Sequence, residues 1–143
     1  MRLPSLACLL VACTSPALAQ QPSLADSVAI FEAAGYKPQG ARWIRCEEDP
    51  PTAAYAPGSI ELQDLNGDGA PEAWVRESSS FCYGATGEHV TLLRRDGTKW
   101  QVLIESVGIA LPHETKRDGW PDIEIGGPNE SGVWKWNGTR YGL

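Results

Sequence analysis

Apolar residues follow a helical period near the start of the chain and a strand period after it. The helical positions are Leu24, Val28, Phe31 and Ala34. Ser23 and Asp26 stand where a capping box would begin a helix, and Gly35 stands where a glycine commonly ends one. Spacings of three and four residues place these apolar side chains on one face. The pattern predicts one short amphipathic helix over Leu24–Ala34.

From Trp43 onward, the pattern is typical of β-strands. Apolar residues alternate with polar ones at Ile60 and Leu62, at Trp100, Val102 and Ile104, and at Ile123 and Ile125. Asp-Gly and Asn-Gly dipeptides, which favour tight turns, occur at residues 66–67, 68–69, 96–97, 118–119 and 137–138. Two polar segments, Glu47–Gly58 and Ser78–Gly87, are predicted to be loops.

A short motif occurs twice. Asp68–Glu72 and Asp118–Asp122 both read Asp-Gly-x-Pro-acid, and each is followed by a short strand and then by a hairpin, at Leu92–Ile104 and Val133–Tyr141. Chance reuse of Asp-Gly turns is the alternative to a true repeat. The repeat predicts a mainly β fold, a small antiparallel β domain of two blade-like units that share one core, with one short N-terminal helix.

The first nineteen residues have the features of a secretory signal peptide. Arg2 precedes an apolar run, and Ala17-Leu18-Ala19 matches a cleavage site before Gln20. We therefore expect a signal peptide over 1–19, a single β-rich domain over 20–143 and a periplasmic or secreted location. The alternative is a lipoprotein anchored at Cys13, since Leu10-Val11-Ala12-Cys13 resembles a lipoprotein box. The apolar run is too short for a transmembrane segment.

Removal of the signal peptide would leave two cysteines, Cys46 and Cys82. In an exported protein, two remaining cysteines are expected to form a disulfide. The alternative is a pair of separate buried thiols.

Composition narrows the classes of partner. The length of 143 residues suits one domain, and the 42% hydrophobic content suffices for a core. The formal net charge of −6 argues against nucleic acid and anionic membrane surfaces, because both attract basic proteins. The acidic balance favours a cationic partner or a metal ion.

The segment Asp64–Glu72 carries oxygen atoms at the spacing of a calcium loop. The side chains at its first, third, fifth and ninth positions are Asp64, Asn66, Asp68 and Glu72, and the carbonyl of Ala70 lies at the seventh. Calcium takes six to eight oxygen ligands, and Gly69 permits the sharp bend that such a loop requires. We expect a structural calcium ion of modest affinity. Magnesium and a metal-free turn are the alternatives.

The loop and the Glu-Ala-Trp-Val that closes it resemble the calcium loops of FG-GAP and VCBS repeats, as in the propellers of integrin α-chains. This resemblance implies a structural calcium ion between two strands of a blade, held by Asp64, Asn66, Asp68, Ala70 and Glu72. The copy at Asp118–Asp122 resembles the loop less closely, because Lys116 stands at an upstream ligand position. The whole chain also resembles small exported bacterial proteins that end in a Trp-Asn-Gly-x-x-Tyr hairpin.

No catalytic residues are expected. Neither His89 nor His113 has a neighbouring nucleophile, and no Gly-x-Ser-x-Gly motif occurs. The sequence favours a protein-binding module for an unknown extracytoplasmic protein, presented on the two predicted loops. The alternatives are an inhibitor or immunity protein against a cationic, lysozyme-like cell-wall hydrolase, and a hydrolase acting on a glycan.

Overall fold

The computed structural model describes residues 20–47, 59–128 and 131–143. Its first element is α1 (Leu24–Ala33), which ends one residue before the predicted boundary. The hydroxyl of Ser23 accepts a hydrogen bond from the backbone N–H of Asp26 at 3.1 Å, so the predicted N-terminal cap is present. The predicted signal peptide, and residues 48–58 of the loop predicted over Glu47–Gly58, lie outside the described residues.

The strands form two four-stranded antiparallel sheets and one small hairpin. The hairpin pairs β1 (Lys37–Gln39) with β2 (Arg42–Ile44). The first sheet contains β3 (Ile60–Gln63), β4 (Glu72–Ser78), β5 (Glu88–Asp96) and β6 (Lys99–Val107). The second contains β7 (Ile109–Arg117), β8 (Trp120–Gly126), β9 (Gly132–Trp136) and β10 (Tyr141–Gly142). In each sheet, consecutive strands are neighbours, which confirms the predicted antiparallel β domain of two blade-like units.

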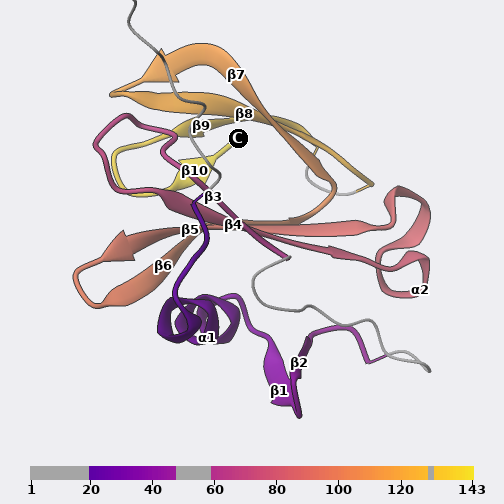
Figure 1. Ribbon diagram of the computed structural model, residues 1–143. Coiled ribbons are helices and arrows are strands. Elements are labelled where there is room, and N and C mark those ends of the chain that lie inside the picture. The colour runs from indigo at the N-terminus through magenta and orange to yellow at the C-terminus, as the bar shows by residue number, and fades with distance from the viewer. Residues whose placement is uncertain (1–19, 48–58, 129–130) are drawn as a thin grey trace, which may run out of the picture.

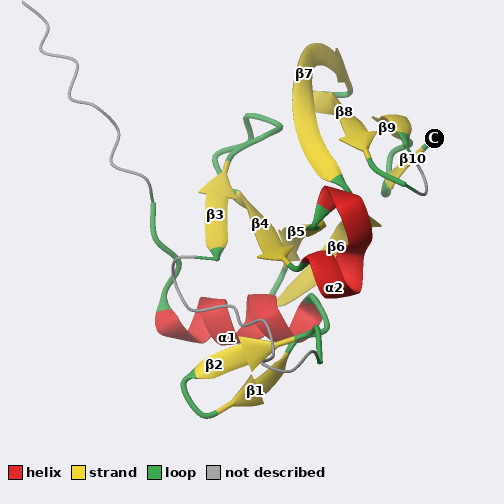
Figure 2. Ribbon diagram, turned by 90° about the vertical axis from the view of Figure 1, so that its right-hand side faces the viewer, coloured by secondary structure: helices red, strands yellow, loops and turns green. Residues whose placement is uncertain are grey.

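The elements lie in three layers. Helix α1 and the β1–β2 hairpin lie on one side of the first sheet, and the second sheet lies on its other side (Figure 1). The view in Figure 2 separates the helix from the two sheets in the same way. Between the sheets lies a core of Leu65, Trp74, Val90, Leu92, Leu103, Ile104, Ala110, Trp120, Ile123, Ile125, Trp134, Trp136 and Tyr141. Between α1 and the first sheet lies a second core of Ile30, Phe31, Ala34, Tyr36, Ile60, Ala73, Val75 and Leu93.

Strand β4 is buried on both faces because it lies between these two cores. Trp74 points to the core between the sheets, and Val75 points to the core under α1. Their cross-strand partners on β5 are Leu92 and Thr91. The consecutive burial of residues 72–75 follows from this position.

Two elements differ from the sequence-based prediction. The segment predicted to be a loop after β4 contains two short helices, α2 (Ser80–Tyr83) and η1 (Gly84–Thr86). Strand β7 carries no clear apolar alternation and includes Pro112, which a strand tolerates at the edge of a sheet. Among the described residues, no helix is both long enough and apolar enough to cross a membrane.

Candidate functional site

The Asp64–Glu72 segment is called the calcium loop below after its prediction from the sequence, and whether it holds an ion stays a prediction. It connects β3 to β4 and is folded around the Asp64 carboxylate. Its Oδ1 accepts hydrogen bonds from the backbone N–H groups of Gly67 at 2.8 Å and Asp68 at 3.2 Å. Its Oδ2 accepts one from Gly69 at 2.9 Å. Gly69 has φ +86, which a glycine adopts without strain. The first predicted ligand therefore sets the curl of the loop.

Two further predicted ligands hold the middle of the loop. The Asn66 Oδ1 accepts a hydrogen bond from the Asp68 N–H at 2.8 Å, and its amide donates to the Asp68 Oδ2 at 3.0 Å. The Asp68 Oδ1 accepts one from the Ala70 N–H at 2.7 Å. These contacts keep polar atoms of the alternate residues Asn66, Asp68 and Ala70 close to one another.

Glu72 is the predicted ligand that is buried, with only 3% of its surface exposed. Its Oε2 accepts a hydrogen bond from the Leu65 N–H at 2.9 Å. Burial, with a smaller contribution from the nearby Asp68 and Asp64 carboxylates, raises the pKa of Glu72 to about 7, against the lowering effect of the Leu65 hydrogen bond. No lysine or arginine in the described part of the chain forms an ion pair with it. A buried carboxylate in this setting fits a bound cation, which would offset the cost of its charge.

The loop opens onto a cavity of about 350 Å³, here called the loop cavity. Its lining comprises Asn66, Asp68, Ala70, Glu72, Arg94, Arg95, Asp96 and Trp120. Four of the five predicted ligands therefore share one cavity, and the fifth, Asp64, braces the backbone behind them. Within the described ranges, no three acidic, histidine or cysteine side chains converge closely enough to form a ready-made metal site.

The second copy of the motif is a tight turn between β7 and β8. Lys116 pairs with Pro121, and Arg117 pairs with Trp120, so the upstream positions belong to a strand instead of a curled loop. The turn packs on the calcium loop, because a Cβ built on Gly119 would lie 3.3 Å from the backbone oxygen of Asn66. The two motifs thus meet at the junction of the sheets.

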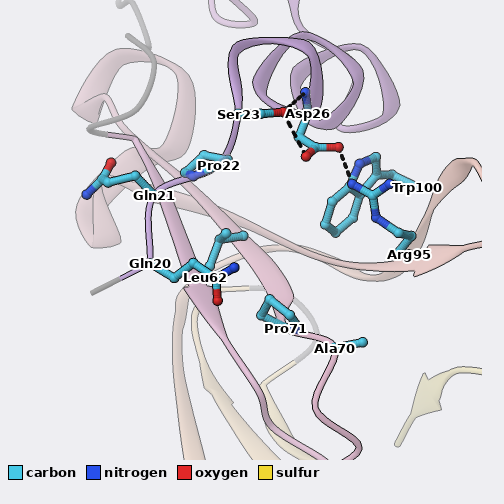
Figure 3. Close-up of a pocket in the computed structure, with 10 residues that line it drawn as sticks. All are labelled: Gln20, Gln21, Pro22, Ser23, Asp26, Leu62, Ala70, Pro71, Arg95 and Trp100. Carbon is cyan, nitrogen blue, oxygen red and sulfur yellow. Dashed lines mark hydrogen bonds and ion pairs between the residues drawn. The ribbon is translucent and has the colours of Figure 1, made fainter. Parts of the chain in front are cut away.

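A second cavity of about 350 Å³ adjoins the loop at Ala70 and Pro71 (Figure 3). The N-terminal segment, residues 20–23, forms one wall of this cavity. The cavity shares Ala70 and Arg95 with the loop cavity. Figure 3 shows the Arg95 guanidinium turned toward the carboxylate of Asp26, with which it forms an ion pair. Arg95 also lies over the Trp100 ring, 5.0 Å from its centre.

The predicted disulfide between Cys46 and Cys82 is confirmed, with the two Cα atoms 6.1 Å apart. This separation lies within the usual range of about 4.4–6.8 Å. The bond ties the segment after β2 to α2. Beside Cys82, Phe81 is 76% exposed.

A buried polar cluster near the disulfide was not predicted from the sequence. Glu77 accepts hydrogen bonds from the Cys46 N–H at 3.3 Å and the Tyr83 hydroxyl at 2.5 Å. Its cross-strand neighbour His89 is 4% exposed, and burial together with the nearby Arg45 guanidinium lowers the pKa of His89. Arg45 itself pairs with Glu105. Strand alternation from Val75 to Glu77 could have indicated an inward carboxylate.

Comparisons with protein-family models, with curated proteins and with solved structures found no match to this chain.

Proposed function

We propose that this protein is an exported, calcium-stabilised β domain that acts as a protein-binding module outside the cytoplasm. The main support for calcium binding is Glu72, a buried carboxylate at the end of the loop. The polar loop residues Asn66 and Asp68 line the same cavity. The Cys46–Cys82 disulfide supports an extracytoplasmic location, since such bonds persist in oxidising compartments.

The ion would be held by the side chains of Asp64, Asn66, Asp68 and Glu72 and by the carbonyl of Ala70. Calcium would supply positive charge beside the carboxylates of Asp68 and Glu72, and it would tie the two ends of the loop together. Leu65 belongs to the core between the sheets, and Asn66 touches the turn at Gly119. An ordered loop would therefore hold the first sheet against the second.

The turn over residues 79–87 is the surface that fits a protein partner best. The Ser79 hydroxyl caps α2 by accepting a hydrogen bond from the Cys82 N–H at 3.1 Å. The disulfide to Cys46 also holds Cys82 in place. Phe81 is therefore an exposed aromatic side chain on a tethered backbone. Aromatic residues that lose little entropy on binding are typical of the centres of protein interfaces.

The net charge of −6 favours a basic partner, because complementary charge speeds association. Lysozyme-like peptidoglycan hydrolases are basic extracytoplasmic proteins, so the second candidate function is inhibition of, or immunity to, such an enzyme. A glycan hydrolase is the remaining alternative.

The calcium part is tested by thermal unfolding of protein that has been stripped with a chelator. Calcium at about 100 times its dissociation constant should stabilise the fold by about 2.7 kcal/mol. Asp68→Ala should abolish this gain. Asp118→Asn is the matched control, because it changes an aspartate of the tight second turn, and it should retain the gain. An unchanged melting temperature of the wild type in millimolar calcium would refute the calcium site.

The binding part is tested by lytic assays with a panel of basic hydrolases, at low and moderate salt. Inhibition that weakens with salt is expected for the wild type, and Phe81→Ala should lose it. Leu24→Ala is the matched control, since Leu24 on α1 is 79% exposed. Degradation of a glycan by the protein alone would instead establish the enzyme alternative. If no hydrolase is inhibited and an envelope pull-down in calcium yields no partner, the binding-module proposal fails.

A further inference from the structure

Arg94 is a positioned arginine without an acidic partner. Its Nε donates a hydrogen bond to the Gln101 Oε1 at 3.1 Å, and its guanidinium carbon lies 5.4 Å from the centre of the Trp136 ring. The side chain is half-buried at the edge of the core between the sheets. Among the described residues, it forms no ion pair with a carboxylate. A guanidinium held on an aromatic ring keeps donors free for an anion.

Its neighbour Arg95 is engaged elsewhere. Successive residues of β5 point to opposite faces of the sheet, so Arg95 turns toward α1 and pairs with Asp26 (Figure 3). Arg94 therefore remains as the cation available on this wall of the loop cavity. Across the cavity lie the calcium-loop residues Asp68 and Glu72.

The charges around the loop cavity make anion binding depend on calcium. Carboxylates of Asp68, Glu72 and Asp96 line it, together with the two arginines. Without calcium, a carboxylate from outside would meet this acidic lining and be repelled. A bound calcium ion would neutralise the loop carboxylates, so that the ion and Arg94 would together attract an anion.

The calcium loop offers five protein oxygens, whereas calcium takes six to eight. The remaining positions must be filled by water or by a ligand from outside. We propose that Arg94 and the calcium loop together form a binding site for the carboxylate of an acidic side chain on the protein partner. This inference rests on the proposed calcium-stabilised binding function. A planar carboxylate matches the guanidinium fork and is also a preferred calcium ligand.

The test uses the ¹⁵N-labelled mature chain, residues 20–143, with a blocked glutamate peptide as the probe. The Arg94 Nε–H and Trp136 indole N–H resonances report on the site and can follow weak, millimolar binding. The glutamate peptide should shift both resonances in calcium and neither of them in chelator. A blocked glutamine peptide of the same size should shift neither in either condition, because it lacks the charge.

Arg94→Gln should weaken binding of the glutamate peptide about tenfold or more, since a charged hydrogen bond is lost. It should not weaken calcium binding in the absence of peptide, because removing a nearby positive charge cannot repel the ion. Arg42→Gln, on the β1–β2 hairpin beyond α1, removes the same charge elsewhere and should leave peptide binding unchanged.

The outcomes separate this inference from the proposed function. If calcium itself does not stabilise the wild type, the calcium site fails, and this inference fails with it. If calcium stabilises the fold but the peptide binds equally well in chelator, or equally well to Arg94→Gln, this inference alone is wrong. Galacturonate that binds in calcium at least about tenfold more tightly than the peptide would overturn the protein partner in favour of an acidic glycan.

Discussion

Two glutamates near the ends of β4 are both buried, but their surroundings differ. Glu77 accepts hydrogen bonds from a backbone N–H and from the Tyr83 hydroxyl. Glu72 accepts one from the Leu65 N–H and lies near two other carboxylates. Hydrogen bonds from the protein thus stabilise Glu77 in its buried position. A bound cation would offset the repulsion between Glu72 and the two nearby carboxylates.

The first prediction concerns this difference. Glu72→Gln keeps the shape of the side chain and its acceptor for the Leu65 N–H, but it removes the buried charge. We expect the metal-free variant to be at least as stable as the metal-free wild type, and to gain nothing from calcium. Melting curves with calcium and with chelator measure both effects.

Glu61→Gln is the control, because Glu61 is an exposed glutamate on the adjacent strand β3. It should retain the full calcium effect. A Glu72→Gln protein that still gains the wild-type calcium stabilisation would remove Glu72 from the ligand set.

The second prediction concerns the pH dependence of stability. Burial and Arg45 lower the pKa of His89 below its ordinary value of 6.5, against the opposing effect of Glu105 and Glu77. As the pH falls, the unfolded chain therefore takes up a proton before the folded protein does. The stability that the protein gains from keeping His89 neutral is fully present above pH 6.5, and it is lost as the pH falls below that value.

Urea unfolding at about pH 8 and about pH 5 measures this loss as a shift of the midpoint. His89→Gln should make the shift smaller than in the wild type. His113→Gln replaces a histidine on the second sheet, which pairs with Glu124 at 2.9 Å, and serves as the control. Equal shifts in the wild type and in His89→Gln would show that this histidine does not contribute.

At the scale of elements, the disulfide ties the segment that follows the β1–β2 hairpin to a short helix that follows strand β4 of the first sheet. Cys46 follows β2, and Cys82 lies in α2 after β4, with a sequence separation of 36 residues. The third prediction is that thiol titration of the denatured, unreduced protein finds no free thiols. Reduction should lower the free energy of unfolding by about 3–4 kcal/mol, because the unfolded chain regains the entropy of an open loop of this length. Two free thiols would contradict the bond.

Local patterns predicted the elements that depend on local spacing. Helix α1 followed from the spacing of Leu24, Val28, Phe31 and Ala34, of which Phe31 and Ala34 are buried. The β5–β6 hairpin followed from its Asp-Gly turn. The curl of the calcium loop followed from the order of its polar residues. Whether those residues hold an ion stays a prediction.

Elements that depend on distant partners could not be predicted in this way. Strand β7 includes Pro112 and mostly exposed polar residues, so only its pairing with β8 makes it a strand. The polar cluster at Glu77 and His89 required the register of β4 against β5. Arg94 reaches Trp136 only because the two sheets pack face to face.

At the scale of the whole molecule, the calcium loop belongs to the first sheet but also contacts the second. Leu65 is buried in the core between the sheets, beside Trp120 and Tyr141. The fourth prediction is that calcium slows amide hydrogen exchange in β8 and β9 as well as in the loop itself. Hydrogen exchange followed by mass spectrometry measures it. Protection confined to residues 64–72 would show that the ion orders the loop without joining the sheets.

The close approach of Gly119 to Asn66 predicts that one chain holds no more than one calcium ion. Gly119 has φ +85, and a side chain there would press on the Asn66 carbonyl. A nine-residue loop rebuilt at the second turn would need the space that the first loop already fills. Because the residues before the second turn are also paired in a strand, we expect calorimetric titration to give a stoichiometry of one calcium ion per chain. Lengthening the second turn into a copy of the first should not create a second site without separating the sheets.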